Sequence, residues 1–177
     1  MINWHLFSEA IHSYTNQGYQ LIDVPWLVDK QSINITLPSG KSNFTVNGCG
    51  ETNQLIGSAE QSFIYLVLQG KLLPGKYQAL TPCFRDDLED EWHNKYFMKL
   101  ELIELGAQYY NNVIRNARGV LSKFTSKKIA AISTQEGSDL IIDGIEIGSY
   151  GKRSYQDIMW AYGTGLAEPR FSKVNSV

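Results

Sequence analysis

The sequence lacks several features that mark large classes of proteins. It has no long uncharged apolar run and no basic segment leading into an apolar one, so we expect no membrane span, no export signal and a cytoplasmic location. Only two cysteines are present, Cys49 and Cys83, without the paired spacing of a zinc knuckle or a redox CxxC motif. We interpret both as buried free thiols, with a metal or disulfide role as the alternative.

An excess of charge of either sign is also missing. The 16 Lys and Arg residues nearly balance the 18 Asp and Glu residues, which argues against a protein that coats DNA or a membrane surface. Five cations gather between residues 115 and 128, where they form either a solvated helix face or an RNA-facing patch. With 177 residues, 43% of them hydrophobic, the chain is expected to fold as one domain, residues 1–177.

Common catalytic motifs are absent as well. The sequence contains no Walker lysine motif and no dinucleotide-binding glycine fingerprint. Nor does it contain a nucleophile with partners at a meaningful spacing, so protease-like and metal-hydrolase chemistry are not expected.

Hydrophobic periodicity predicts alternating helices and strands. Helices are expected at residues 2–16, 58–70 and 110–124, and helical spacing also occurs at 154–160. Strands are expected at residues 19–24, interrupted at Pro25 and resumed at 26–28, and at 139–147, where Gly144 marks a bulge or a turn. A hairpin and a loop are expected at 34–47. The stretch from 81 to 105 is expected to be a second hairpin, whose charged loop offers a cation, carboxylates and aromatic faces to one ligand.

Two further groups of residues suggest binding chemistry. Gly163 and Gly165 allow a backbone to approach a ligand closely, and Arg170 beyond them has the planar fork that suits phosphate. A turn beside a surface ion pair is the alternative. Carboxylates on expected strands, among them Asp143 and Glu146, are candidates for a divalent cation because acids are disfavoured in strands without a partner.

Three segments together resemble the signature motifs of class II aminoacyl-tRNA synthetase catalytic domains. QGYQLIDVPWLV resembles the first motif, TPCFRDD with YFMKLELIEL the second, and GTGLAEPR the third. GSAEQSF is similar to the amino-acid-binding loop of seryl-tRNA synthetases, and DGIEIGSYGKR resembles a strand of aspartate-ammonia ligase. The resemblance implies an α+β fold in which helices flank an antiparallel sheet, as in biotin ligases. It also implies a homodimer through the stretch that begins at Gly18 and ends at Val28.

The resemblance also implies roles for individual residues. It assigns Arg85 to the α-phosphate of ATP and Arg170 to the γ-phosphate, as the catalytic pair. The other ATP-binding residues implied are Asp87 on the adenine side, His93 near the γ-phosphate, Phe97 stacked on adenine, Gly163 and Gly165. The amino-acid-binding residues implied are Ser58, Glu60, Glu101, Ser149 and Arg153, and those for Mg²⁺ are Glu146 and Asp143.

The implied activity is ATP-dependent, Mg²⁺-assisted adenylation of a small carboxylate, and an amino acid is the favoured substrate. The adenylate would pass to ammonia, a protein or tRNA, and tRNA is possible but not favoured because few cations are spare. Seven residues follow Arg170, so we expect the helix after the third motif to be missing or reduced to a short turn. The alternative is a non-catalytic relative that keeps the fold for ligand binding or regulation.

Overall fold

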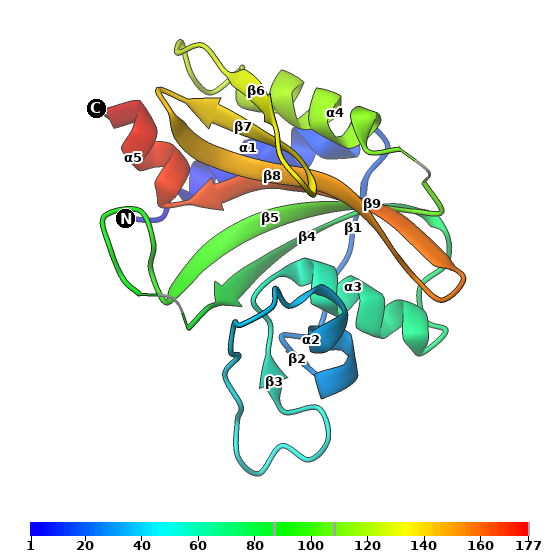
Figure 1. Ribbon diagram of the computed structural model, residues 1–177. Helices are drawn as coiled ribbons and strands as arrows, with labels where there is room; N and C mark the ends of the chain where they lie inside the picture. Colours follow the sequence, from blue (N-terminus) through cyan, green and yellow to red (C-terminus); the bar gives the residue numbers. More distant parts are fainter. Residues whose placement is uncertain (87, 108, 177) are drawn as a thin grey trace.

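The computed structural model describes residues 1–86, 88–107 and 109–176 (Figure 1). Within these ranges the helices are α1 (Trp4–Thr15), α2 (Lys30–Thr36), α3 (Ala59–Leu68), α4 (Asn111–Leu121) and α5 (Arg170–Ser176). The strands are β1 (Gln20–Leu21), β2 (Leu27–Val28), β3 (Gln54–Leu55), β4 (Gly75–Phe84), β5 (Tyr96–Leu105), β6 (Ala130–Ser133), β7 (Gly137–Ile142), β8 (Ile145–Tyr155) and β9 (Ile158–Glu168).

One large sheet organises the molecule. Among the described residues it has seven strands in the order β1-β4-β5-β9-β8-β7-β6, and β2 and β3 form a separate pair. Neighbours in the large sheet are antiparallel except β1, which runs parallel to β4. The expectation of an antiparallel sheet flanked by helices is confirmed.

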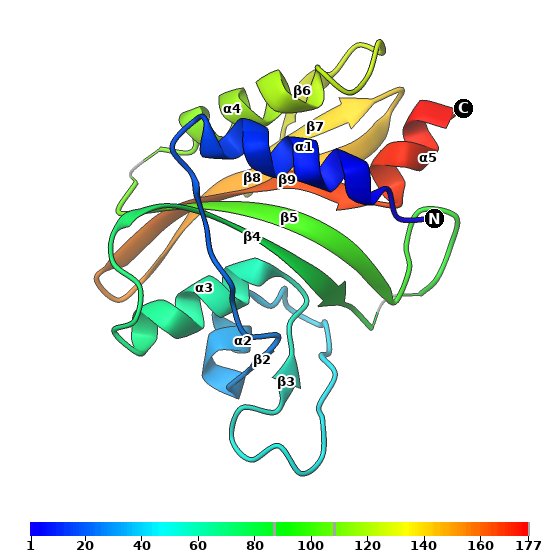
Figure 2. The same ribbon diagram turned by 180° about the vertical axis from the view of Figure 1, so that it is seen from behind.

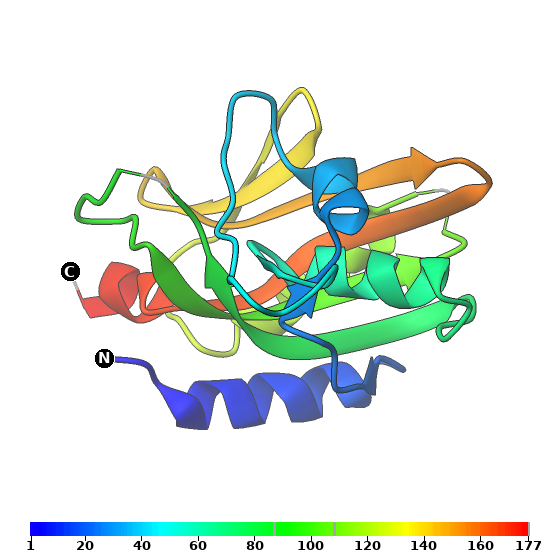
Figure 3. The ribbon, with the colours of Figure 1, turned by 90° about the horizontal axis from the view of Figure 1, so that it is seen from below.

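Each face of the sheet packs against different helices. Helices α1 and α4 lie together on one face, and α2 and α3 lie on the other, as the views from behind and from below show (Figures 2 and 3). Strand β5 contributes side chains to the cores on both faces of the sheet, because successive side chains of a strand point to opposite faces. Leu100 and Leu102 join the core under α1 and α4, while Ile103 joins the core that contains Phe63 of α3. Lys99 and Glu101 therefore point to the α3 side.

The hairpin around the charged loop is confirmed in full. Strands β4 and β5 pair in unbroken register from Gly75 opposite Leu105 to Phe84 opposite Tyr96. The helices expected at residues 2–16, 58–70 and 110–124 are also present as α1, α3 and α4. Helix α1 is capped by the Asn3 side chain, which accepts a hydrogen bond from the Leu6 amide at 3.2 Å.

The interruption expected at Pro25 is present, and the strands on either side of it are short. Two residues, β1, join the large sheet before it, and two, β2, join the small pair after it, because Pro25 cannot donate to a ladder. One expectation near the N-terminus was wrong. The hairpin at residues 34–47 is instead the end of α2 and a loop with one bridge, between Thr45 and Gln54. Asp29 caps α2 by accepting from the Ser32 amide at 2.7 Å, which is a start signal for a helix.

Two expectations near the C-terminus need correction. Of the two alternatives at Gly144, the turn is the one present, so the strand expected at 139–147 is divided into β7 and β8. Asp143 and Gly144 both adopt positive φ, 51° and 83°, as a tight two-residue turn requires. A helix was expected at 154–160, but the segment is instead the turn between β8 and β9, where Gln156 has a φ of 51°. Trp160 is fully buried whereas Met159 is 45% exposed, which is strand alternation.

The cysteine expectation holds only in part. Both thiols are free, but Cys49 is exposed and only Cys83 is buried. Burial raises the pKa of the Cys83 thiol to about 12, which keeps it protonated and unreactive. No described helix is long and apolar enough to cross a membrane.

Close packing under α4 leads to a stability prediction. A Cβ at Gly163 would lie 2.3 Å from Cδ1 of Tyr150 and 2.8 Å from Cγ1 of Val113, whereas a Cβ at Gly119 would meet nothing within 4 Å. We expect Gly163→Ala to lower the free energy of unfolding by about 1–3 kcal/mol, as overpacking does. The control Gly119→Ala should raise it by up to about 1 kcal/mol through helix propensity. Urea unfolding of both variants measures this, and equal effects would contradict the packing argument.

Candidate active site

A cavity of about 340 Å³ lies on the α3 side of the sheet. Its walls come from the α2–β3 segment, the start of α3, strands β4, β5, β8 and β9, and the start of α5. Ten of the residues expected in the site line it: Ser58, Glu60, Arg85, His93, Phe97, Glu101, Glu146, Ser149, Arg153 and Arg170. Residues that lie far apart in the sequence are thus gathered around one space.

Three expected site residues do not line the cavity. Gly163 and Gly165 have their missing side chains on the other face of the sheet, where a Cβ at Gly165 would lie 3.1 Å from the Tyr14 ring. They are small so that α1 and α4 can pack closely, rather than to admit a ligand. Asp143 lies in the β7–β8 turn with its carboxylate 3.0 Å from Nζ of Lys127. Asp87 lies outside the described residues.

The side chains of Arg85, just after β4, and Phe97, on β5, are in contact across the hairpin. The Arg85 guanidinium carbon is 5.1 Å from the centre of the Phe97 ring, and Nε of Arg85 donates to the Gly57 carbonyl at 3.2 Å. The arginine is exposed and held by few contacts. It can move toward an anion in the cavity without breaking the core, and its movement would uncover the aromatic face.

Arg170 joins the start of α5 to the charged loop between β4 and β5. Its Nη2 donates to the Trp92 carbonyl at 3.1 Å, and its Nη1 lies 3.8 Å from a Glu146 carboxylate oxygen. Lys173, one turn later, donates to the Glu91 carbonyl at 2.8 Å. Two cations from α5 therefore hold the loop at the cavity mouth.

His93 sits in the same loop and pairs with Asp90. Its Nδ1 is 2.8 Å from both carboxylate oxygens of Asp90, and the hydrogen bond from His93 lowers the pKa of that carboxyl. The pair is exposed, so solvent screens it. It lies on the side of the cavity that Arg85 and Arg170 also line.

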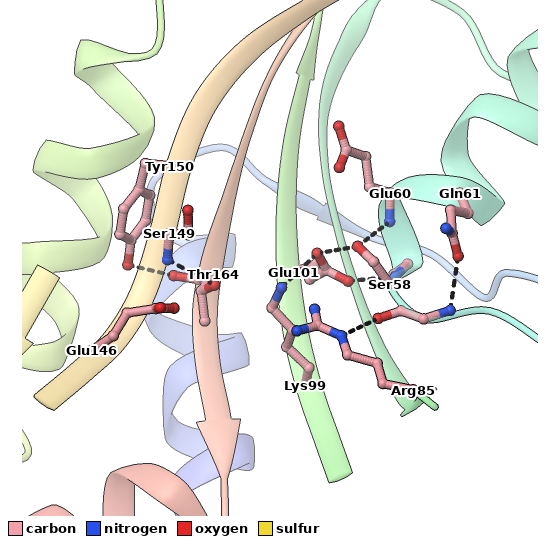
Figure 4. Close-up of polar contacts among 12 residues, drawn as sticks. Ser58, Glu60, Gln61, Arg85, Lys99, Glu101, Glu146, Ser149, Tyr150 and Thr164 are labelled. Carbon is pink, nitrogen blue, oxygen red and sulfur yellow. Dashed lines mark hydrogen bonds and ion pairs between the residues drawn. The ribbon is translucent and has the colours of Figure 1, made fainter. Parts of the chain in front are cut away.

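Glu101 joins the start of α3 to the sheet (Figure 4). Its carboxylate accepts from the Ser58 hydroxyl at 2.7 Å, from Nζ of Lys99 at 2.9 Å, and from the Ala59 amide. Burial alone would raise the pKa of Glu101, but Lys99 and these hydrogen bonds bring it below the ordinary value. Glu101 is therefore ionised at neutral pH and already fully occupied by protein donors.

Glu60 is the second buried carboxylate of the cavity. Its Oε1 accepts from the Trp160 indole at 2.6 Å, and its Oε2 accepts from Nη1 of Arg153 at 2.6 Å. Burial raises the pKa of Glu60, and Arg153 and Trp160 partly offset that rise. The guanidinium of Arg153 also lies 4.2 Å from the centre of the Tyr162 ring.

The opposite wall of the cavity consists of β8 and β9. The Ser149 amide donates to Oγ1 of Thr164 at 3.3 Å, and the Tyr150 hydroxyl donates to the Thr164 carbonyl at 2.7 Å. Glu146, near the start of β8, projects toward the cavity from this wall (Figure 4). Glu168, at the end of β9, is buried, and its Oε2 has no hydrogen-bond partner.

A tight protein cage for Mg²⁺ is not formed. Among the described residues, no three of the His, Cys, Asp and Glu side chains are grouped so as to hold a metal. Mg²⁺ is commonly bound by one or two carboxylates together with substrate phosphates and water. Glu146, which lines the cavity near Arg170, fits that kind of binding, and Asp143 does not because it faces Lys127.

Comparison with solved structures finds a similar fold in pyrrolysyl- and seryl-tRNA synthetases. The pyrrolysyl-tRNA synthetase from Desulfitobacterium hafniense matches 98% of this chain with a TM-score of 0.75 and 16% identity. The seryl enzyme from Naegleria fowleri, solved with AMP, matches 96% with a TM-score of 0.77 and 18% identity. That from Pyrococcus horikoshii, solved with ATP, matches 96% with a TM-score of 0.74 and 18% identity. The fold is that of a class II synthetase catalytic domain.

The match covers only part of each neighbour. This chain spans 69% of that pyrrolysyl structure, 66% of a second one from the same organism, and 46% and 49% of the two seryl structures. Neither a protein-family model nor the sequence of a curated protein matches the chain. At these identities the likeness establishes the fold, and the chemistry has to be argued from the cavity.

Sequence reasoning missed several residues of the cavity. Lys99 was detectable, because strand alternation from Phe97 places it on the same face as Glu101. Tyr162 and Thr164 were detectable in the same way, because in a strand they lie on the opposite face from Gly163 and Gly165. Other members required the tertiary structure, because no local pattern marks them: Trp92, Glu136 and Glu168. The same is true of Trp160, which donates to Glu60 from behind the cavity wall.

The ionised state of Glu101 leads to a pH-dependent prediction. Because its folded pKa lies below the unfolded value, its contribution to stability is present above the unfolded pKa and is lost as pH falls through the folded pKa. We expect Glu101→Gln to lower the free energy of unfolding by about 2–3 kcal/mol at pH 7, since it leaves Lys99 without its buried partner. Denaturant unfolding at pH 7 down to pH 3 should show this difference shrinking. A difference independent of pH would contradict the assignment.

Proposed function

We propose that this chain activates a small amino acid by ATP-dependent adenylation. The observation that carries the proposal is that Arg85, Phe97 and Arg170 line the same cavity as Ser58 and Glu60. The first three suit a triphosphate and a purine, because they offer two guanidinium forks and an aromatic face. At the other end an ammonium group would compete with Arg153 and Trp160 for the buried carboxylate of Glu60. The fold shared with the seryl and pyrrolysyl enzymes supports this interpretation.

The reaction needs no protein nucleophile. A carboxylate oxygen of the amino acid attacks the α-phosphorus of ATP, the bond from that phosphorus to the bridging oxygen breaks, and pyrophosphate leaves. Two anions must approach each other, and Arg85 is placed to neutralise charge at the α-phosphate. Arg170 would hold the terminal phosphates so that the attacked phosphorus is presented in line. Mg²⁺, contacted by Glu146, would supply further positive charge at the phosphates.

Binding of ATP would replace contacts made in the free protein. Arg85 covers Phe97, so adenine can stack there only after the guanidinium moves toward the phosphates. Arg170 donates to the Trp92 carbonyl, so a phosphate would compete for the same fork. Nucleotide binding should therefore rearrange the loop between β4 and β5.

The acceptor is proposed to be something other than a tRNA. Three of the five cations at residues 115–128 bond within the protein, because Arg115 donates to the Asn112 side chain, Arg118 to the Ile129 carbonyl and Lys127 to that of Val174. A tRNA requires several spare cations for its phosphates. Ammonia or a protein amine remains compatible with the cavity. We propose that this takes place in the cytoplasm, within one domain.

Pyrophosphate exchange tests the proposed activity. We expect ATP–pyrophosphate exchange with at least one amino acid in a panel that includes serine and aspartate. Arg85→Ala should reduce the rate by about 10²- to 10³-fold, as loss of one preorganised charge does elsewhere. Arg170→Ala should weaken ATP binding without unfolding the protein, while the exposed helix variant Arg115→Ala serves as the control. Absence of both exchange and ATP binding would favour the non-catalytic alternative.

A homodimer is proposed through the stretch from Gly18 to Val28. Leu21, on edge strand β1, is 48% exposed, and Trp26 just beyond it is 51% exposed. We expect Trp26→Glu to shift the protein to a monomer, because a charge would be buried in an apolar contact. Analytical ultracentrifugation measures this, with the exposed Trp4→Glu on α1 as the control. A wild-type monomer at micromolar concentration would rule the dimer out.

A further inference from the structure

Three charged side chains from three different elements form a chain across one end of the cavity. Arg153 of β8 lies in the middle, with Nη1 2.6 Å from Glu60 of α3 and Nη2 2.9 Å from Glu136. Glu136 belongs to the turn between β6 and β7, and it lines the same cavity. Sequence reasoning had assigned it no role.

Backbone packing determines the position of Glu136. Gly137 lies opposite Gly151 in the β7–β8 ladder, two residues before Arg153. A Cβ at Gly151 would lie 2.7 Å from the Glu136 carbonyl oxygen, and one at Gly137 would lie 2.0 Å from the carbonyl oxygen of Tyr150. The two glycines thus let the turn approach β8 closely, which brings the Glu136 carboxylate to the guanidinium.

The two carboxylates are held very differently. The Glu60 side chain is 6% exposed and accepts a second hydrogen bond from Trp160, whereas the Glu136 side chain is 70% exposed and pairs with Arg153. Glu60 therefore belongs to the core of the site. Glu136 is a surface carboxylate whose removal leaves the fold intact.

The charge balance of this group determines what it can bind. Two carboxylates and one guanidinium carry a net charge of −1, and both terminal nitrogens of Arg153 are already paired. A substrate carboxylate binds arginine best through two parallel N–H donors, which are not available while Glu136 is in place. It would also meet the like charges of Glu136 and Glu60. Neutral side chains meet no such repulsion.

We propose that Glu136 is a specificity-determining residue that masks Arg153 and so excludes amino acids with acidic side chains. The inference rests on the proposed adenylation activity and deepens it by naming the substrate class, which is a small amino acid with an uncharged side chain. Removal of the Glu136 charge frees Nη2 of Arg153 and cancels the net negative charge. Acidic amino acids then become substrates.

The test compares pyrophosphate exchange by wild type and Glu136→Gln over a panel containing serine, alanine, threonine, aspartate and glutamate. Wild type should prefer the uncharged members. In Glu136→Gln the ratio of kcat/KM for uncharged over acidic substrates should fall by about tenfold or more, because a like-charge penalty has been removed. Glu51→Gln makes the same change of charge on an exposed loop away from the cavity and should leave the ratio unchanged.

A second variant checks that the gain depends on Arg153. In Glu136→Gln combined with Arg153→Lys, a cation remains beside Glu60 but the planar fork is lost, so the gain for acidic substrates should disappear. An unchanged substrate ratio in Glu136→Gln, or a wild type that prefers aspartate or glutamate, would overturn the inference while leaving the adenylation activity standing. A wild type that neither exchanges pyrophosphate nor shows a thermal shift with any amino acid would overturn both.

Discussion

The buried carboxylate of Glu101 is the interaction on which the site depends. It lies on strand β5 and accepts hydrogen bonds from the Ser58 hydroxyl, which caps α3, and from the Ala59 amide at the first residue of that helix. Lys99 supplies the compensating charge from the same strand face. Because α3 is fixed to the sheet at its first residues, the next side chain, Glu60, is directed at Trp160 and Arg153.

Charges of both signs line the cavity at each of its ends. Where α3 meets β5 and β8, the buried carboxylates of Glu60 and Glu101 pair with Arg153 and Lys99. Near the charged loop and α5, Arg170 lies close to Glu146. In the free protein Arg85 donates to the Gly57 carbonyl and Arg170 to the Trp92 carbonyl, and an anionic ligand would compete for both guanidinium groups.

Local signals predicted the parts of the fold that local physics controls. Periodicity was sufficient for α1, α3, α4 and the β4–β5 hairpin, because each has a continuous apolar face, and α1 and α3 also have the N-cap residues Asn3 and Ser58. It failed at α2 and at the two C-terminal turns. In those places Asp29, Asp143 and Gln156 determine the local structure through a cap or a positive φ, against the apparent pattern.

The sequence by itself determined which residue types were available, namely two arginines with an aromatic partner and acids on strands, and the order of the motifs that carry them. Only the tertiary structure decided their use. It placed Gly163 and Gly165 against α1 and α4, directed Asp143 to Lys127, and brought Glu136 to Arg153. The physical reason is that strand pairing and close backbone approach are non-local, so the face and partner of a side chain depend on register and packing rather than on its neighbours in the chain.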